Sequence, residues 1–170
     1  MKTVKIVITF LVILSVLFFS TGLIIKDSSY DSQITILKPV DDTFAMFTNV
    51  STMTNWNPEY SSVEIVDQKP GITGSSYNII IQHNDLTTIV KEKVLAYVKN
   101  EKLTLFFDRD GVIERDEYSF IAEGNSTIIH LNASYQAKSY ILGCVLPFFK
   151  SKFKNIDEVS LKNFKAFAEK

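Results

Sequence analysis

The chain opens with a continuous hydrophobic run and then changes to short alternating stretches. From Ile6 to Ile25 the run covers ~20 residues without a charge, and a helix of that length spans roughly 30 Å, the hydrocarbon thickness of a bilayer. Lys2 and Lys5 precede it. The positive-inside rule therefore predicts a single-pass membrane segment with a cytoplasmic N-terminus and an extracytoplasmic C-terminal domain.

Two other interpretations of this run stay open. A cleaved signal peptide, which would leave a secreted protein, has a shorter apolar region and a small-residue cleavage site. Residues 20–22, "STG", offer such a site, but the apolar run continues past it, which favours an uncleaved anchor. A buried core helix is disfavoured because the segment is apolar on every face. We expect an anchor over 1–26, a polar tether over 27–32 and a domain over 33–170.

The rest of the chain alternates with a period of two, which is typical of β-strands. A first strand over Gln33–Lys38 ends at Pro39. Asp41 or Asp42 then caps a helix, and a very short second helix covers Ser51–Asn55. The strands that follow are joined by turns of about two to six residues, so they form an antiparallel meander. They are expected over 61–68, 75–82, 86–98, 102–108, 112–123 and 126–138.

The C-terminal segment changes to a helical period. Pro147 suits its first turn, and apolar residues after it share one arc at helical spacing while charged residues lie off that arc. This predicts an amphipathic helix of about six turns and an α+β fold, with a curved seven-stranded antiparallel sheet around the helix. The apolar arc comprises Phe149, Phe153, Ile156, Phe164 and Phe167, with Ser160, and the residues off it include Lys152, Asp157, Glu158, Lys162 and Lys165.

Three stretches of the sequence resemble the START-like (SRPBCC) superfamily, of the polyketide cyclase and lipid-transport type. They are "KPVDDTFAMFTNVSTMTNWNPEY" over 38–60, "KPGITGSSYNI" over 69–79 and "GNSTIIHL" over 124–131. The resemblance covers Ser32 to Lys170. It implies a helix-grip fold, with two short helices after the first strand and a cavity between sheet and C-terminal helix that holds a hydrophobic small molecule or lipid.

The amino-acid composition argues against several classes of function. Apolar residues make up 46% of the 170 residues, enough for a real core, and the net charge of −1 gives no basic stripe for nucleic acid. One cysteine and two histidines exclude a cysteine-based zinc cluster and a histidine-rich metal site. Because no nucleophile elbow, P-loop, dinucleotide fingerprint or metal-ligand spacing is present, we expect no cofactor and no metal.

Ligand contacts are expected from the inner surface of the grip. Trp56, in the linker after the short helices, either covers the core or contacts a ligand at the cavity mouth. Glu92 faces inward if Val90 and Val94 do, and a buried carboxyl needs a partner, so it is the candidate polar anchor. The remaining candidates are aromatic: Tyr77, Phe106, Tyr118, Phe120, Tyr135, Phe149 and Phe153.

The other polar residues are expected at turns or on the solvent-facing side of the sheet. The charges between Arg109 and Glu117 occupy consecutive positions, which is typical of a solvated hairpin end. His83 sits at a turn. His130 faces water if Ile129 and its alternate neighbours face inward, although the opposite register is possible.

Three functions follow from this pattern. The favoured one is a membrane-anchored, non-catalytic protein that binds a hydrophobic molecule. The second is a cyclase- or hydrolase-like enzyme, which requires an inward carboxylate or histidine with a shifted pKa. The third is an interaction or stress-response module, which requires an exposed apolar patch and no cavity.

Overall fold

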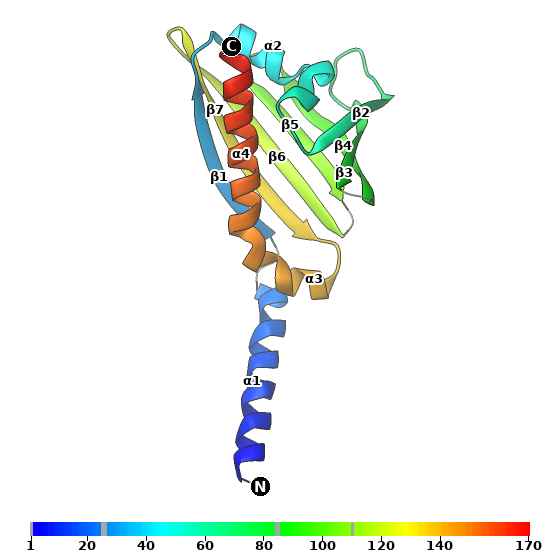
Figure 1. The fold of residues 1–170 in the computed structure, drawn as a ribbon, viewed down its shortest axis with the longest axis vertical. Helices are drawn as coiled ribbons and strands as arrows, with labels where there is room; N and C mark the ends of the chain where they lie inside the picture. The colour runs from blue at the N-terminus through cyan, green and yellow to red at the C-terminus, as the bar shows by residue number, and fades with distance from the viewer. Residues whose placement is uncertain (1, 25–26, 84–85, 110) are drawn as a thin grey trace.

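The computed structural model describes residues 2–24, 27–83, 86–109 and 111–170 and shows one apolar helix standing below a sheet-and-helix domain (Figure 1). Helix α1 (Lys2–Ile24) has 23 residues and a mean hydropathy of 2.6 over its most apolar window, none of which is buried in the protein. It is therefore long and apolar enough to cross a membrane.

The domain is built on one seven-stranded antiparallel sheet in the order β1-β7-β6-β5-β4-β3-β2. Consecutive strands pair from β2 to β7, and β1 adds to the free edge of β7, which confirms the predicted meander and fold class. The strands are β1 (Asp27–Ile36), β2 (Tyr60–Asp67), β3 (Ser76–His83), β4 (Leu86–Val98), β5 (Lys102–Arg109), β6 (Val112–Glu123) and β7 (Ser126–Ala137).

Strand β1 starts earlier than the sequence pattern predicts. Residues 27–32, expected as a tether, pair with β7 from Asp27 opposite Gln136 to Ser32 opposite Leu131. The tether was inferred from polar side chains, whereas strand pairing uses the backbone, which β7 offers at its open edge. Tyr30 is buried as a result, with 5% of its surface exposed.

Helices close the grip at both ends. The two predicted short helices are present as α2 (Val40–Phe47) and the 3₁₀ helix η1 (Val50–Asn55). The predicted long C-terminal helix is present as α4 (Lys150–Ala168), and two short helices precede it, α3 (Tyr140–Val145) and the 3₁₀ helix η2 (Leu146–Phe149). Pro147 lies in η2, where its missing N–H costs no hydrogen bond, and only α4 runs along the concave face of the sheet (Figure 1).

Alternation along β7 fixes which side chains form the core. Ile129, Leu131, Ala133 and Tyr135 are each at most 4% exposed, so the register that turns His130 away from the core is the one adopted. At the α2 end of the sheet, five rings pack with centroids 4.9 to 5.4 Å apart. This aromatic cluster consists of Phe44, Phe47, Trp56, Phe120 and Phe164.

Candidate functional site

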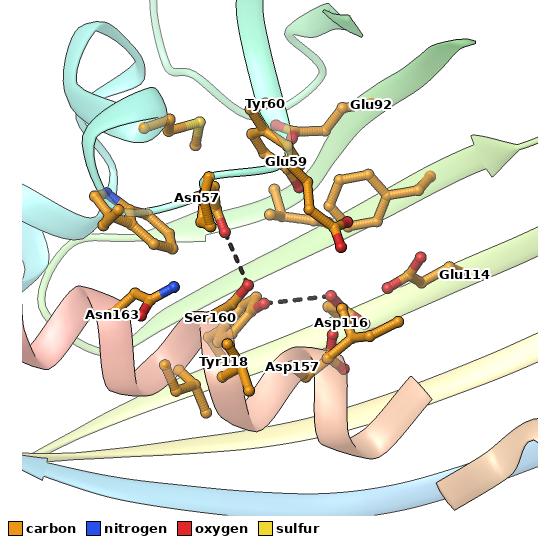
Figure 2. Close-up of a pocket in the computed structure, with 18 of the residues that line it drawn as sticks. Asn57, Glu59, Tyr60, Glu92, Glu114, Asp116, Tyr118, Asp157, Ser160 and Asn163 are labelled. Carbon is orange, nitrogen blue, oxygen red and sulfur yellow. Dashed lines mark hydrogen bonds between the residues drawn. The ribbon is translucent and has the colours of Figure 1, made fainter. Parts of the chain in front are cut away.

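A cavity of about 280 Å³ lies between α4 and the inner face of the sheet. Strands β4, β5 and β6 contribute one side, α4 the facing side, and the segment 56–60 that follows η1 closes it above (Figure 2). An apolar cavity of about 150 Å³ already accommodates benzene. The space is therefore sufficient for a small organic molecule.

One part of the cavity lining is apolar and aromatic. Leu105 and Phe107 project from β5, and Met53 and Trp56 border the space from η1 and its C-terminal end. Trp56 is 6% exposed, and its ring centroid lies 5.3 Å from that of Phe47 in the aromatic cluster. The single tryptophan thus covers the core, as one of the two expectations from sequence has it, and also borders the cavity.

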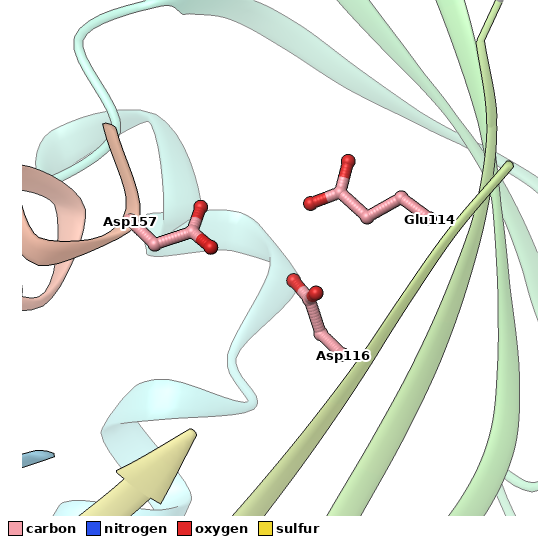
Figure 3. Close-up of side chains that lie close together, drawn as sticks. All are labelled: Glu114, Asp116 and Asp157. Carbon is pink, nitrogen blue, oxygen red and sulfur yellow. The ribbon is translucent and has the colours of Figure 1, made fainter. Parts of the chain in front are cut away.

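The other part of the lining is unusually acidic. Glu92, Glu114 and Asp116 point inward from β4 and β6 and are 2–3% exposed, and Asp157 faces them from α4. One carboxylate oxygen from each of Glu114, Asp116 and Asp157 lies within 4.8 Å of the other two (Figure 3). Three carboxyl groups therefore converge in a space that bulk water scarcely reaches.

Tyrosine hydroxyls and one arginine hold these carboxyl groups. The hydroxyl oxygens of Tyr30 and Tyr135 lie 3.1 Å apart; the Tyr30 oxygen is 2.5 Å from Asp157 Oδ2 and the Tyr135 oxygen 2.8 Å from Glu114 Oε1. Arg109 Nε lies 3.1 Å from Glu114 Oε2. The result is a continuous polar chain from α4 across β1 and β7 to β6 and β5.

The two tyrosine hydroxyls supply two protons to the three contacts of this chain. Tyr30 donates to Asp157 Oδ2 and Tyr135 donates to Glu114 Oε1, while the two hydroxyl oxygens lie 3.1 Å apart. A third proton, carried by Asp157, would make all three contacts hydrogen bonds.

The electrostatics agree with that count. Burial raises the pKa of Asp157 to about 7, although the hydrogen bond with Tyr30 acts in the opposite direction. Burial alone raises the pKa of Glu92 to about 7, and burial followed by the negative charge of Glu114 raises the pKa of Asp116 well above its ordinary value. Glu92 and Asp157 therefore exchange protons near neutral pH, where ordinary acidic side chains are ionised.

Three of the residues predicted from sequence line the cavity: Trp56, Glu92 and Tyr118. The hydroxyl of Tyr118 donates to Asp116 Oδ2 at 3.2 Å (Figure 2). Tyr77 lies beside Glu92 around a separate small void of about 20 Å³. For all of these, contact with a ligand stays a prediction.

Three further candidates, two buried and Phe153 partly buried, take part in the packing around the cavity. Phe120 is part of the aromatic cluster. Tyr135 and Phe153 stack face to face with their centroids 4.4 Å apart, which closes the grip beyond the carboxyl groups.

Two candidates lie elsewhere, so their expected inward position is wrong. Phe106 pairs with Arg115 of β6 and faces the outside of the sheet, because the inward positions of β5 are Leu105 and Phe107. Phe149 lies in η2 with 42% of its surface exposed, since the helix that was expected to carry it inward begins only at Lys150. The side chain of His83 lies outside the described residues.

Sequence reasoning missed four polar residues of the site. Glu114 and Asp116 share the face of Tyr118 and Phe120 by simple alternation, and interpreting the charges as a solvated hairpin end was wrong for these two. The expectation that Asp157 lies off the apolar arc of the helix is wrong: it is one helical turn from both Phe153 and Leu161 and lines the cavity. Arg109 lines the same cavity from the end of β5.

Comparison of the sequence finds no match to a family model and no match among curated proteins. Solved structures do match. A crystal structure of Ara h 8.0201 has a TM-score of 0.67 and 12% identity, covering 84% of this chain and 97% of that chain. The Zhui aromatase/cyclase from Streptomyces sp. R1128 has a TM-score of 0.67 and 10% sequence identity, and the match covers 84% of this chain and 94% of that chain. A START superfamily protein from Mycobacterium smegmatis has a TM-score of 0.64 and 12% sequence identity, and the match covers 78% of this chain and 93% of that chain.

Identities this low show the fold and no more. The neighbours include START-like proteins and polyketide aromatase/cyclases, and the shared region spans nearly the whole length of each of the three. The chain therefore has the START-like helix-grip fold, as the resemblance in its sequence implies.

Proposed function

We propose that this protein is a membrane-anchored, non-catalytic binding protein that holds a small, largely apolar molecule between α4 and the sheet. The observation that carries the proposal is the cavity of about 280 Å³, bordered by Trp56, Leu105 and Phe107 and by a few polar groups. Ligand sites have this character: mostly apolar walls with a small number of placed polar anchors. The volume favours a molecule of one or two rings over a whole phospholipid.

Unpartnered polar atoms around the cavity support a bound molecule. Among the described residues, Trp56 Nε1 and Asp116 Oδ1 are buried without a hydrogen-bond partner. A buried polar atom left unpaired costs about 1–3 kcal/mol. A ligand with its own polar group would remove part of that cost.

The anchor is supported by how α1 meets the domain. Thr21 Oγ1 donates to the backbone oxygen of Cys144 at 3.0 Å, and Phe19 stacks on Tyr140 with centroids 6.4 Å apart. A Cβ at Gly22 would lie 2.5 Å from Cys144 Sγ, so glycine is what allows this approach. Apolar side chains exposed on α3 and η2 continue the apolar surface of α1 onto the domain: Tyr140, Ile141, Phe148 and Phe149.

Such a surface suits the interface of a bilayer, where aromatic residues gather. In the proposed topology, α1 crosses the membrane and the domain stands outside the cytoplasm with its α3 end against the lipid. Membranes washed with alkaline carbonate should retain the full chain, and protease added to intact cells or spheroplasts should degrade the domain. Release of the chain by carbonate would contradict the anchor, and protection of the domain would reverse the topology.

Ligand binding is tested by filling the cavity. Ser160 borders it from α4, so Ser160→Phe places a ring in the space, whereas Ser151→Phe adds the same ring at an exposed position of the same helix. Full-length chains purified from membranes are extracted, and the released small molecules are compared by mass spectrometry. A compound present with wild type and Ser151→Phe but absent with Ser160→Phe is expected. Equal extracts from all three would contradict the proposal.

Acid–base catalysis is the second candidate function, favoured by the buried carboxyls whose pKa values lie near 7. A general acid or base is most effective when its pKa is close to the working pH. A recovered compound that the purified protein converts, and that Glu92→Gln leaves unchanged, would replace the binding proposal by this one. An interaction module without a cavity is disfavoured by the cavity itself.

A further inference from the structure

The cavity has a large excess of negative groups over positive ones. Carboxyls reach it from three elements, β4, β6 and α4, and Glu59 stands exposed beside it. Among the described residues that line it, Arg109 is the one cationic side chain, and its Nε is engaged with Glu114 Oε2 at 3.1 Å. The acidic groups are Glu59, Glu92, Glu114, Asp116 and Asp157, and the tyrosines that face them are Tyr30, Tyr60, Tyr118 and Tyr135.

Two of these acidic groups have a carboxylate oxygen without a hydrogen bond. Asp116 is 2% exposed; its Oδ2 accepts from Tyr118, and its Oδ1 accepts no hydrogen bond from the described part of the chain. Glu92 is 3% exposed, and burial is the sole cause of its raised pKa, with no hydrogen bond or neighbouring charge contributing. Since a buried carboxyl normally has a donor or a cation beside it, both groups have room for one supplied from outside the protein.

The walls suit an organic cation with an apolar body. Trp56, Tyr60, Phe107 and Tyr118 surround the space with aromatic surface. An ammonium group is attracted to aromatic faces as well as to carboxylates. Met53, Leu105, Ile156 and Leu161 add apolar surface that would contact carbon atoms, and Asn57, Asn155, Ser160 and Asn163 add polar side chains.

A metal ion fits the carboxyl cluster less well. Glu114 Oε1 accepts from Tyr135, Glu114 Oε2 is ion-paired with Arg109 without a hydrogen bond, and Asp157 Oδ2 accepts from Tyr30. Calcium takes six to eight oxygen ligands and magnesium a near-ideal octahedron.

We propose that the cavity selects a small apolar amine in its protonated form, with the ammonium group against Asp116 and the carbon body against Trp56 and Phe107. This inference rests on the proposed binding function and adds the chemical class of the ligand. Glu92 lies further from the bound ammonium than Asp116, on β4, and contributes to the negative potential of the cavity.

The test uses three probes with a phenyl ring on a two-carbon chain: 2-phenylethylamine, 2-phenylethanol and phenylacetate. Trp56 is the single tryptophan of the chain and borders the cavity, so its fluorescence reports binding without a label. The full-length protein is titrated in lipid nanodiscs, with empty nanodiscs as the blank. At pH 8 the amine should bind roughly 10- to 100-fold more tightly than the alcohol, as one charge-assisted contact provides, and phenylacetate should bind most weakly.

Proton linkage gives a second readout. An amine of this kind stays protonated between pH 6 and 8, roughly like a lysine side chain, whereas Glu92 and Asp157 lose protons in that range. Amine affinity should therefore rise with pH, by at most about tenfold per pH unit for each proton released. The affinity of the alcohol should change little.

Asp116→Asn keeps the shape of the side chain and removes its charge. Amine affinity should fall to within about threefold of the alcohol, and alcohol affinity should stay unchanged. Glu92→Gln should reduce amine affinity by a smaller factor. If Asp116→Asn does not fold, the wild-type ranking and pH profile, together with Glu92→Gln, still decide the question.

The outcomes separate the two proposals. If the alcohol binds as tightly as the amine, or if Asp116→Asn retains the preference, amine selection is wrong and the binding function stands. If calcium or magnesium chloride displaces the amine at matched ionic strength, the site is a metal site and amine selection is also wrong. If no probe changes Trp56 fluorescence and filling the cavity by Ser160→Phe changes no extract, the binding function itself fails.

Discussion

The two ends of the interior differ although the same sheet and the same helix enclose both. At the α2 end, the aromatic cluster fills the space with rings at centroid distances of 4.9 to 5.4 Å. One to two turns earlier along α4, Asp157 and Ser160 border a cavity with four inward carboxyl groups. The packed end supplies stability, and the hollow end accepts unfavourable burial of polar groups, which is characteristic of functional sites.

The largest expected loss of stability comes from a substitution in the aromatic cluster at the packed end. Phe164 is fully buried and touches both Phe47 and Trp56, so Phe164→Ala should lower the free energy of unfolding by about 3–5 kcal/mol. Phe106→Ala removes the same ring from the outer face and should cost about 1 kcal/mol or less. Urea titration of the full chain in detergent, followed by far-ultraviolet circular dichroism, compares them. Equal losses would mean that the aromatic cluster is not the stabilising end.

The next effect concerns Glu92 at the hollow end, and its sign depends on pH. Because the folded-state pKa of about 7 exceeds the ordinary value of 4.5, the folded protein holds this proton more tightly. Glu92 therefore costs no stability below pH 4.5, and the cost grows as pH rises to 7, reaching about 3 kcal/mol. Glu92→Gln should be more stable than wild type at pH 8 by up to that amount and similar to it near pH 5.

The exposed Glu64 on β2 provides the matched control for this change. Glu64→Gln should alter the free energy of unfolding by less than about 0.5 kcal/mol at either pH. A Glu92→Gln variant that is less stable than wild type at pH 8 would show that Glu92 has a partner and that the hollow end is not strained by its charge.

A smaller effect is expected at the polar chain that links Asp157 on α4 to Glu114 on β6 through Tyr30 and Tyr135. Tyr30→Phe removes the hydroxyl that contacts Asp157 and Tyr135, and it should lower the free energy of unfolding by about 1–2 kcal/mol. Tyr97→Phe, whose ring packs against Phe44, serves as the control and should cost less than about 0.5 kcal/mol. Thermal unfolding at pH 6 and 8 measures both. A loss as small as that of the control would contradict a cooperative chain.

The packed end was largely predictable from sequence, and the hollow end was not. Alternation along β7 favoured Ile129 and Leu131 as inward residues, while the apolar Ile128 left the opposite register possible. Along β5, Leu103, Leu105, Phe106 and Phe107 leave the period of two ambiguous, so Phe106 was given the wrong face. Alternation did predict Glu92 as inward-facing, since Val90 and Val94 flank it.

The carboxyl cluster depends on partners that are remote in sequence. Asp157 tolerates partial burial because the hydroxyls of Tyr30 from β1 and Tyr135 from β7 lie beside its carboxyl group. No local sequence pattern predicts such a pairing. Glu114 is likewise held by Tyr135 and Arg109. Local rules assign clustered charges to solvent, which is correct for Arg115 and wrong for its two neighbours.

The most direct measurement of the central claim is a crystal structure of the full chain grown with 2-phenylethylamine. Electron density for one guest should lie between α4 and β5, against Trp56, Leu105 and Asp116, with none inside the aromatic cluster. An interior closed by side chains, with the compound bound only on the outer surface, would contradict the account.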